Sequence, residues 1–258
     1  MKIPEDLHCF ESLVGIIAYL RSPQGCPWDR KQSHQSLREH LLEETYEVLE
    51  ALDEENGNKL GAELGDLLMQ IVMHAQLAAE AGGFNIGDVI DGINRKLIIR
   101  HPHVFEKGQA KTAEDVLMHW EELKKKERLG EGSMLDGVPK ALPALAYSLS
   151  VQDRVARVGF DWPTDEGVLD KMVEEIAEFK AGAVPEEKAT EFGDILFTLV
   201  NYARRQGIDP EAALREANSK FYRRFSCLEE LARRRGLELG KMTLDELNLL
   251  WDEAKNAV

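Results

Sequence analysis

The chain has 258 residues, of which 43% are hydrophobic and 31% are charged, and its formal net charge at pH 7 is −15. This length can bury one large or two modest cores, and this composition excludes a wholly disordered chain. The acidic balance argues against a polynucleotide as the main ligand, because affinity for a phosphate backbone rests on clustered Lys and Arg.

No apolar run approaches the length of a bilayer span, and the N-terminal segment MKIPEDLHCF is acidic rather than basic. The three cysteines, Cys9, Cys26 and Cys227, are scattered and show no CxxC spacing, so they indicate neither a disulfide framework nor a zinc site. We therefore expect a cytoplasmic protein with reduced thiols and no membrane contact.

Glycine and proline residues divide the chain into pieces of helix length, and no stretch alternates polar and apolar residues as a strand does. The sequence therefore predicts an all-α protein. Helices are expected over residues 7–21, 34–55, 59–81, 86–100, 112–129, 140–158, 165–182, 186–206, 210–235 and 243–256. Residues 130–139 (GEGSMLDGVP) are expected to form a linker.

The segments on the two sides of this linker repeat each other. LEETYEVLEAL at 42–52 matches VEEIAEFKAG at 173–182, and AELGDLLMQIV at 62–72 matches TEFGDILFTLV at 190–200. Further correspondences join 93–101 with 217–225, 119–124 with 250–255 and, loosely, 25–29 with 159–163. The repeat predicts two homologous helical-bundle domains, an N-terminal one at 1–129 and a C-terminal one at 140–258.

Each repeat places acidic residues on two successive predicted helices. In the second repeat, Glu175 and Glu178 are three residues apart, as are Glu191 and Asp194, so each pair shares a helix face. The stretch EFGDILFTLVNY that begins at Glu191 has no other charge and is apolar around most of its circumference, so we expect it to be buried. Ionised carboxylates on a buried helix need a counter-charge or a metal ion, and a metal site is therefore predicted.

The same carboxylate pattern occurs in the first repeat, at Glu44, Glu47, Glu63 and Asp66. Oxygen ligands alone favour hard cations, so the expected metal is Mg²⁺, with Mn²⁺ as a substitute. A di-iron bundle needs an ExxH motif from each of two helices, and the second repeat cannot supply one because all seven histidines lie at or before His119. Acids on helices also exclude an EF-hand, whose ligands come from a glycine-containing loop.

The helix after the second acidic pair carries positive charge. Lys220 and Arg224 are four residues apart and share a face, and Asn218 lies close to them in sequence. Cations opposite carboxylates and a divalent metal ion suit a polyphosphate ligand. Trp251, with Trp120 as its counterpart, offers a surface on which a nucleotide base could stack, and core packing is the alternative role. Likewise, Lys220 and Arg224 could be ordinary surface cations, and Glu191 and Asp194 could cap the first turn of a helix.

At these residues the chain resembles the MazG family of all-α nucleoside triphosphate pyrophosphohydrolases, whose signature is EExxE, a spacer and then ExxD. The resemblance covers nearly the whole chain, including GCPWD at 25–29, the LEETYE run, RHPHVF at 100–105 and the order of the two domains. It implies Mg²⁺-dependent cleavage of a nucleoside triphosphate between the α and β phosphates, which gives a nucleoside monophosphate and pyrophosphate. It also implies a role in clearing the nucleotide pool, and a homodimer with bundles formed across the subunit interface.

The resemblance assigns roles to particular residues. It implies that Glu175, Glu178, Glu191 and Asp194 are metal ligands and that one of these glutamates orients or deprotonates the attacking water. The implied triphosphate and base contacts are Lys171, Lys188, Asn218, Lys220, Arg224 and Trp251. In the first repeat, the implied ligands are Glu44, Glu47, Glu63 and Asp66, with Lys96, Arg100 and Trp120 around them.

The two predicted sites differ at one position, because His40 stands in the first repeat where Lys171 stands in the second. Since histidine is mostly neutral at pH 7, one positive contact is weaker in the first site. We therefore expect the C-terminal site to be the main catalytic one. Two other functions stay open: a dUTP- or dCTP-selective pyrophosphatase on the same scaffold, and a non-catalytic nucleotide-sensing or partner-binding bundle that retains the metal site.

Overall fold

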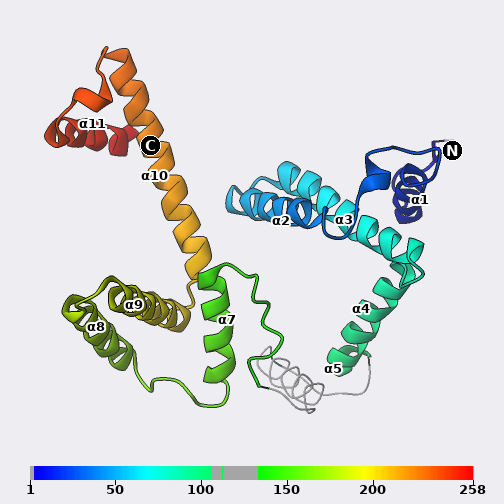
Figure 1. The fold of residues 1–258 in the computed structure, drawn as a ribbon, viewed down its shortest axis with the longest axis horizontal. Helices are drawn as coiled ribbons and strands as arrows, with labels where there is room; N and C mark the ends of the chain where they lie inside the picture. The colour runs from blue at the N-terminus through cyan, green and yellow to red at the C-terminus, as the bar shows by residue number, and fades with distance from the viewer. Residues whose placement is uncertain (1–2, 106–111, 113–132, 258) are drawn as a thin grey trace. The chain divides into compact units, whose positions relative to one another are not determined.

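The computed structural model of the chain describes residues 3–105, 112 and 133–257. Every regular element within these residues is a helix, which confirms the predicted all-α class (Figure 1). Contacts between Cα atoms divide the chain into two compact units, Met1–Glu131 and Gly132–Val258. None of the described helices is both long and apolar enough to cross a membrane.

The N-terminal unit is organised around one long helix. Its helices are α1 (Phe10–Leu20), α2 (Arg38–Asp53), α3 (Gly57–Glu80), α4 (Ile86–Arg100) and α5 (Pro102–Phe105), with a short 3-10 helix η1 at Asp29–Lys31. Helix α3 contacts α1, α2 and α4. Its buried residues Val72 and Met73 form a core with Ile17 of α1 and with Leu37, which immediately precedes α2. The acid-bearing α3 is thus held in place from several sides.

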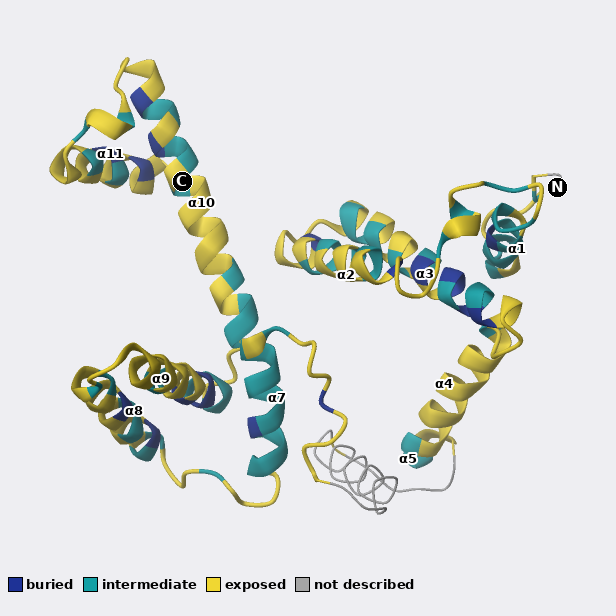
Figure 2. Ribbon diagram, in the orientation of Figure 1, coloured by how far each residue is buried: buried dark blue, intermediate teal, exposed yellow. Residues whose placement is uncertain are grey.

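The C-terminal unit is arranged around two helix pairs. Its helices are α7 (Ala144–Ala156), α8 (Asp165–Ala181), α9 (Pro185–Arg205), α10 (Pro210–Arg234) and α11 (Leu244–Ala257), with the 3-10 helix η2 at Leu239–Lys241. Helix α9 packs against α8 and α7, and α11 packs on the end of α10 through a core of Leu228, Ala232, Leu250 and Ala254. Figure 2 shows that the middle of α10 is exposed between these packed regions. Most of α4, in the N-terminal unit, is exposed as well.

The helix boundaries agree with those expected from the sequence to about one turn. The helix predicted over 86–100 coincides with α4, where Asn85 and Asp88 form a capping box. Helix α7 begins at Ala144 rather than at 140, because Leu142 precedes Pro143 and the residue before a proline disfavours helical geometry. The helix predicted over 112–129 lies outside the described residues apart from Thr112, and the short elements η1, α5 and η2 were not predicted.

The described part of the predicted linker is attached to the C-terminal unit. Ser133 and Asp136 close a turn through a 2.7 Å bond from the Ser133 amide to the Asp136 carboxylate. Arg154 of α7 donates to the backbone carbonyls of Met134 and Asp136, at 3.3 Å and 2.6 Å. Val138, at the end of this stretch, is buried. Residues 133–138 therefore pack on α7 instead of forming a free connection.

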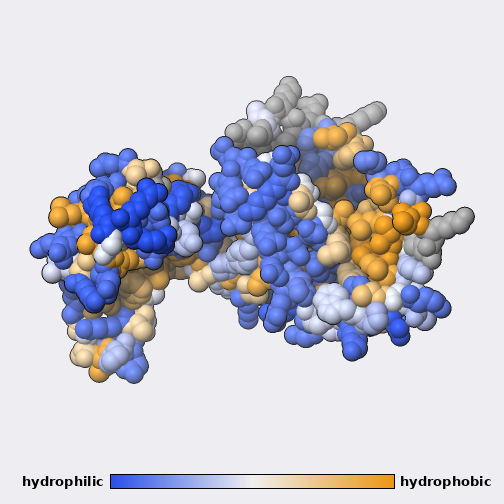
Figure 3. All heavy atoms as spheres, turned by 90° about the horizontal axis from the view of Figure 1, so that it is seen from above, coloured by the Kyte–Doolittle hydropathy of each residue, from blue (hydrophilic) through white to orange (hydrophobic). Residues whose placement is uncertain are grey.

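The expectation that the apolar helix from Glu191 to Tyr202 is buried is wrong for the single chain. Phe192, Leu196 and Leu199 on α9 are 51%, 39% and 44% exposed. The reason is that α7 and α8 cover only part of the α9 circumference. On the face of the molecule drawn in Figure 3, hydrophobic residues gather in patches between hydrophilic ones. The apolar face that the sequence predicts is present, but no described element of its own unit covers all of it.

An arginine cluster anchors the loop before α8 to the end of α9. Arg204 lies 2.6 Å from Asp161, and Arg205 lies 2.6 Å from Asp165 and donates to the Trp162 carbonyl at 2.7 Å. These arginines hold the pKa of Asp165 and of Asp161 below their usual values, through hydrogen bonds and charge that outweigh partial desolvation. The loop at 159–163 (GFDWP) is thereby fixed to α9, the helix that carries Glu191.

The corresponding loop in the N-terminal unit has a similar anchor. Arg21, at the end of α1, forms two hydrogen bonds with Glu80 on α3, at 2.9 Å and 2.7 Å. The same guanidinium donates to the backbone carbonyls of Asp29 and Gln32. One buried arginine therefore joins the GCPWD loop, α1 and the acid-bearing α3.

A pair of imidazoles ties the segment before α2 to α3. The Nδ1 atoms of His34 and His74 are 2.8 Å apart, and the two rings stack with centroids 5.1 Å apart. Burial, and secondarily the charge of His34, lower the pKa of His74. The folded chain therefore favours the neutral form of His74.

This lowered pKa predicts a pH-dependent stability. The unfolded chain binds a proton at His74 more readily than the folded chain, so the contribution is complete above the unfolded pKa of about 6.5 and is lost as the pH falls below it. We expect His74→Gln to flatten the fall in free energy of unfolding between pH 7.5 and 5.5, measured by urea denaturation. Parallel curves for the two proteins would contradict this assignment.

Candidate metal centres

Three carboxylates converge in the C-terminal unit, from the two helices predicted to carry them. Glu175 and Glu178 come from α8 and Glu191 comes from α9, and one oxygen of each lies within 4.8 Å of the others. Glu175 is 5% exposed, whereas Glu191 is half-buried and Glu178 is exposed. We call these three residues the C-terminal trio. Asp194 is not part of this trio. It lies one turn after Glu191 on α9, and its negative charge contributes to the raised pKa of Glu191.

A lysine neutralises the buried member of the C-terminal trio. The Nζ atom of Lys171 lies 2.8 Å from Glu175 and 2.7 Å from Glu174, and hydrogen bonds to these carboxylates raise the pKa of Lys171. Desolvation and the charges of Glu178, Asp194 and Glu175 raise the pKa of Glu191. Mutual repulsion of the acids is therefore only partly relieved by Lys171, and the trio favours an additional cation.

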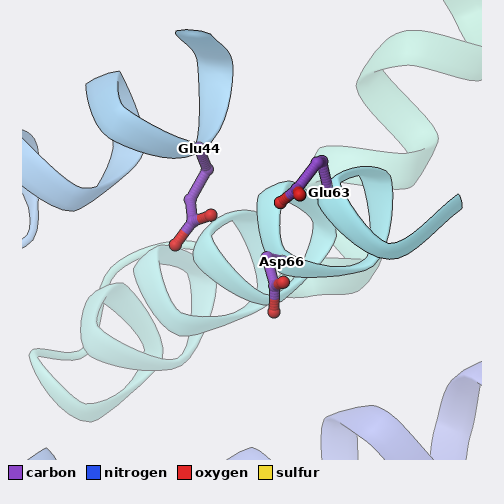
Figure 4. A group of neighbouring side chains, drawn as sticks. All are labelled: Glu44, Glu63 and Asp66. Atoms are coloured by element: carbon purple, nitrogen blue, oxygen red, sulfur yellow. The ribbon is translucent and has the colours of Figure 1, made fainter. Parts of the chain in front are cut away.

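The N-terminal unit holds an equivalent cluster, shown in Figure 4. Glu44 extends from α2 toward Glu63 and Asp66 on α3, again with oxygens within 4.8 Å of one another. We call these three residues the N-terminal trio. Glu47 lies beside this trio. Desolvation, followed by the charge of Glu47, raises the pKa of Glu63. The second glutamate of each repeat thus has a different place, inside the trio at Glu178 and beside it at Glu47.

Among the residues that the structure describes, no lysine pairs with Glu44 as Lys171 pairs with Glu175. His40, at the position of Lys171, lies 3.5 Å from Glu43 and contacts the edge of Trp28, with ring centroids 6.1 Å apart. Desolvation, followed by the charges of Asp66, Glu47 and Glu43, raises the pKa of Glu44, whereas a hydrogen bond from the side chain of Gln70 lowers it. The N-terminal trio therefore receives a neutral donor in place of a cation.

The donor sets of both trios fit a hard divalent cation. All of their ligand atoms are carboxylate oxygens, and no histidine or cysteine belongs to either trio. Oxygen-only sites are typical of Mg²⁺, Mn²⁺ and Ca²⁺, whereas zinc and iron sites usually include nitrogen or sulfur. Desolvation, followed by the charges of neighbouring acids, raises the pKa of Glu44, Glu63 and Glu191, and a bound cation would offset both effects.

The predicted phosphate contacts of the C-terminal unit are not assembled around its trio. Lys220 and Asn218 are exposed on α10, and Arg224 is half-buried with an Nε atom that has no hydrogen-bond partner. No interaction among the described residues joins Lys220 or Arg224 to the trio. Lys188 is exposed near the start of α9, beside Gly182.

The predicted base contacts have two outcomes. Trp251 packs on the core between α10 and α11, and its ring centroid lies 5.3 Å from that of the exposed Phe221. Trp120 lies outside the described residues. In the first repeat, Lys96 is exposed and Arg100 is half-buried on α4.

Sequence reasoning missed Gln70, beside the N-terminal trio, and the His34–His74 pair, which involves the next turn of α3. Gln70 is 4% exposed on α3 and bonds to Glu44. A polar residue within LLMQIVMHAQL was the available signal, because uncharged polar residues on an apolar helix face are buried only with partners.

Comparison with known proteins matches both repeats to pyrophosphohydrolases. Residues 32–105 match the family described as MazG nucleotide pyrophosphohydrolase domain, and residues 159–221 match phosphoribosyl-ATP pyrophosphohydrolase. Over 95% of its length, the chain is 46% identical to a Thermotoga maritima protein named nucleoside triphosphate pyrophosphohydrolase/pyrophosphatase MazG, of which it covers 95%. It is 43% identical to the nucleoside triphosphate pyrophosphohydrolase of Escherichia coli K12, over 95% of this chain and 96% of that protein.

A third relative is a longer protein. The chain is 48% identical over 96% of its length to the uncharacterized protein YabN of Bacillus subtilis, of which it covers 52%. The matched regions contain the trios on α2 with α3 and on α8 with α9. With this similarity over nearly its whole length, the chain belongs to the MazG family of nucleotide pyrophosphohydrolases.

Proposed function

We propose that this chain hydrolyses nucleoside triphosphates to nucleoside monophosphates and pyrophosphate, mainly at the C-terminal trio. The carrying observation is the convergence of Glu175, Glu178 and Glu191 in a member of the MazG family. The names of two relatives, from Thermotoga maritima and Escherichia coli, specify this activity for those proteins. Both family descriptions also denote a pyrophosphohydrolase, so both repeats favour the same class of bond.

The residues of the trio have distinct proposed roles. Lys171 fixes the buried carboxylate of Glu175 and neutralises part of its charge. Glu178 is the exposed member, so its carboxylate is the one available to orient a water molecule and to accept its proton. A divalent cation, which we assign as Mg²⁺ with Mn²⁺ as a substitute, supplies charge neutralisation on the phosphoryl oxygens when it is bound. Asp194 and Glu191 on α9 complete the proposed ligand set.

In the reaction, water adds across the bond between the α and β phosphates. The water oxygen ends on one phosphoryl group, and the bridging oxygen remains with the other. Lys171, Lys188, Asn218, Lys220 and Arg224 are the proposed triphosphate contacts, and Trp251 is the proposed base contact beside Phe221. Clearance of unwanted nucleotides in the cytoplasm is the proposed cellular role.

We further propose that each chain consists of two homologous domains, 1–129 and 140–258, and that two chains form a homodimer. Two observations support a second copy as the partner. The apolar residues Phe192, Leu196 and Leu199 of α9 are exposed within their own unit. In addition, Lys220 and Arg224 do not contact the trio of the same chain, so a neighbouring subunit could complete the site. Burial of such an apolar face would stabilise the assembly by about 25 cal/mol per Å².

The assignment of the main site predicts unequal effects of two glutamate substitutions. Glu178→Ala should lower kcat/KM for pyrophosphate release by about 100-fold or more, because it removes the water-facing carboxylate. Glu47→Ala, beside the N-terminal trio, should retain most of the activity. Asp170→Ala, at an exposed acid on the same α8, is the matched control and should behave as the unmodified chain.

Steady-state release of pyrophosphate and monophosphate from the common nucleoside triphosphates measures all three variants. Equal losses from Glu178→Ala and Glu47→Ala would contradict the dominance of the C-terminal site. An unmodified chain that releases no pyrophosphate with Mg²⁺ would instead favour a non-catalytic, nucleotide-sensing bundle.

Because the acids of the C-terminal trio repel one another, we expect Mg²⁺ binding to stabilise the folded chain. Because the folded-state pKa of Glu191 is raised, its ionisation opposes folding above that pKa, and the opposition disappears as the pH falls below it. Glu191→Gln should therefore raise the Tm of the metal-free chain while weakening its response to Mg²⁺. In the unmodified chain, free Mg²⁺ at 100 times its Kd should stabilise one site by about 2.7 kcal/mol.

Calorimetry in EDTA and in Mg²⁺, with Asp170→Asn as a control that changes charge on α8 outside the trio, measures this linkage. A Glu191→Gln chain that gains as much stability from Mg²⁺ as the unmodified chain would exclude Glu191 as a ligand.

The proposed dimer predicts a solution mass of twice 29.1 kDa by light scattering. Leu199→Asp should shift the protein to the monomer mass, because it places a charge on the exposed apolar face of α9. Leu244→Asp, at a residue that is 72% exposed on α11, is the matched control and should remain dimeric. An unmodified chain with the monomer mass would contradict the proposal.

A further inference from the structure

Two buried polar atoms on α3 lack hydrogen-bond partners among the described residues. They are Oε1 of Gln70 and Nε2 of His74. Residues four apart share a helix face, so the two side chains lie one turn apart on the same side of α3. An unsatisfied buried donor or acceptor costs about 1–3 kcal/mol, so two such atoms on residues one helical turn apart require an explanation.

Each of these side chains is bonded at its other end. The amide of Gln70 donates to Glu44 of the N-terminal trio. Nδ1 of His74 lies 2.8 Å from Nδ1 of His34, a residue exposed to solvent. The unpaired atoms therefore occupy the middle of a series that begins at the surface and ends at a carboxylate of the trio.

One tautomer satisfies the whole series. If His34 donates its Nδ1–H, neutral His74 accepts at Nδ1 and carries its own proton on Nε2. Nε2–H is then a donor, and Oε1 of Gln70 is an acceptor on the same helix face. The Gln70 amide group, polarised by this bond, donates in turn to Glu44.

We propose that Gln70 and His74 are positioning residues for Glu44, joined by one water molecule that accepts from His74 Nε2 and donates to Gln70 Oε1. The series His34, His74, Gln70 and Glu44 fixes one oxygen of that carboxylate and leaves the other for a metal ion. This inference rests on the metal-binding part of the proposed function, and it concerns the N-terminal trio rather than the proposed main catalytic site.

The second repeat explains why the first one needs this device. There, Lys171 holds Glu175 by an ion pair of 2.8 Å. In the first repeat, His40 interacts with Glu43 and leaves Glu44 without a cation. The positions of Gln70 and His74 correspond to Thr198 and Tyr202 in the second repeat, where no such imidazole pair can form. The two sites therefore position equivalent glutamates by different means, one by charge and the other by a series of neutral donors.

Mn²⁺ binding to the full-length chain, measured by electron paramagnetic resonance, tests the proposal without relying on activity. The parent protein carries Glu178→Ala and Glu191→Ala, which disable the C-terminal trio and leave the N-terminal trio to bind the ion. Gln70→Leu, which removes the donor at similar volume, should weaken Mn²⁺ binding by about tenfold or more. Thr198→Val, at the corresponding buried position of the second repeat, is the matched control and should match the parent.

Two substitutions of His74 separate positioning from packing. His74→Leu should weaken Mn²⁺ binding, whereas His74→Gln should largely restore it, because a glutamine amide places an N–H donor near the position of Nε2. Circular dichroism compares the helix content of each variant with that of the parent. If Gln70→Leu does not fold, the two His74 variants still decide the question.

Parent-like affinity in both Gln70→Leu and His74→Leu would overturn the proposal, as would equal losses in His74→Gln and His74→Leu. A parent that binds no Mn²⁺ would overturn it as well, together with the metal site of the first repeat. Neither result would remove the proposed hydrolysis, which is read separately as pyrophosphate release by the unmodified chain.

Discussion

The packing of one acid-bearing helix against another is the constraint on which both candidate sites depend. Glu175 and Glu178 on α8 face Glu191 on α9 closely enough for their oxygens to lie within 4.8 Å of one another. Like charges at this distance repel, so the separation has to be maintained by apolar contacts and loop anchors elsewhere in the unit. The ion pairs of Arg204 and Arg205 with the loop before α8 supply one such anchor, and the GCPWD loop has its own in Arg21. The packing of the helices thus holds carboxylates together against an electrostatic repulsion that a bound cation would reduce.

The two repeats manage this repulsion differently although their helices correspond. Lys171 places an ammonium group on the buried Glu175, so part of the charge is already neutralised before a metal ion arrives. Glu44 instead receives a hydrogen bond from Gln70, which favours the ionised form but adds no positive charge. The difference between His40 and Lys171 therefore changes the charge beside the equivalent glutamates Glu44 and Glu175. The two repeats thus differ in the groups that surround the equivalent residues Glu44 and Glu175, and in part in the acids that gather beside them.

The sequence predicted the helices, and it predicted that acids from two successive helices meet in each repeat, because both depend on local periodicity. The spacing of Glu175 and Glu178 along one helix is enough to place them on one face, and an apolar helix with acids at one end indicates where they meet. What could not be predicted depends on which elements pack together in three dimensions. The exposure of Leu199 follows from the limited cover that α7 and α8 give to α9, and the pairing of Lys171 with Glu175 follows from side-chain geometry. The link from Gln70 to Glu44 joins two helices and has no signature in spacing alone.

Charge also limits how the proposed substrate can approach. A nucleoside triphosphate is a polyanion, the chain carries a net charge of −15, and the C-terminal trio consists of carboxylates. Lys171 cannot compensate alone, because its Nζ atom is shared between Glu174 and Glu175. Lys188 of α9 and Lys220 and Arg224 of α10 are the remaining cations assigned to the site, and among the described residues neither Lys220 nor Arg224 interacts with the trio. If the proposed function holds, substrate binding requires two things that a single chain lacks. One is a cation bound by the trio, and the other is a subunit interface that places Lys220 and Arg224 of α10 near a trio. The exposed apolar face of α9 suggests that one subunit interface could supply the second of these.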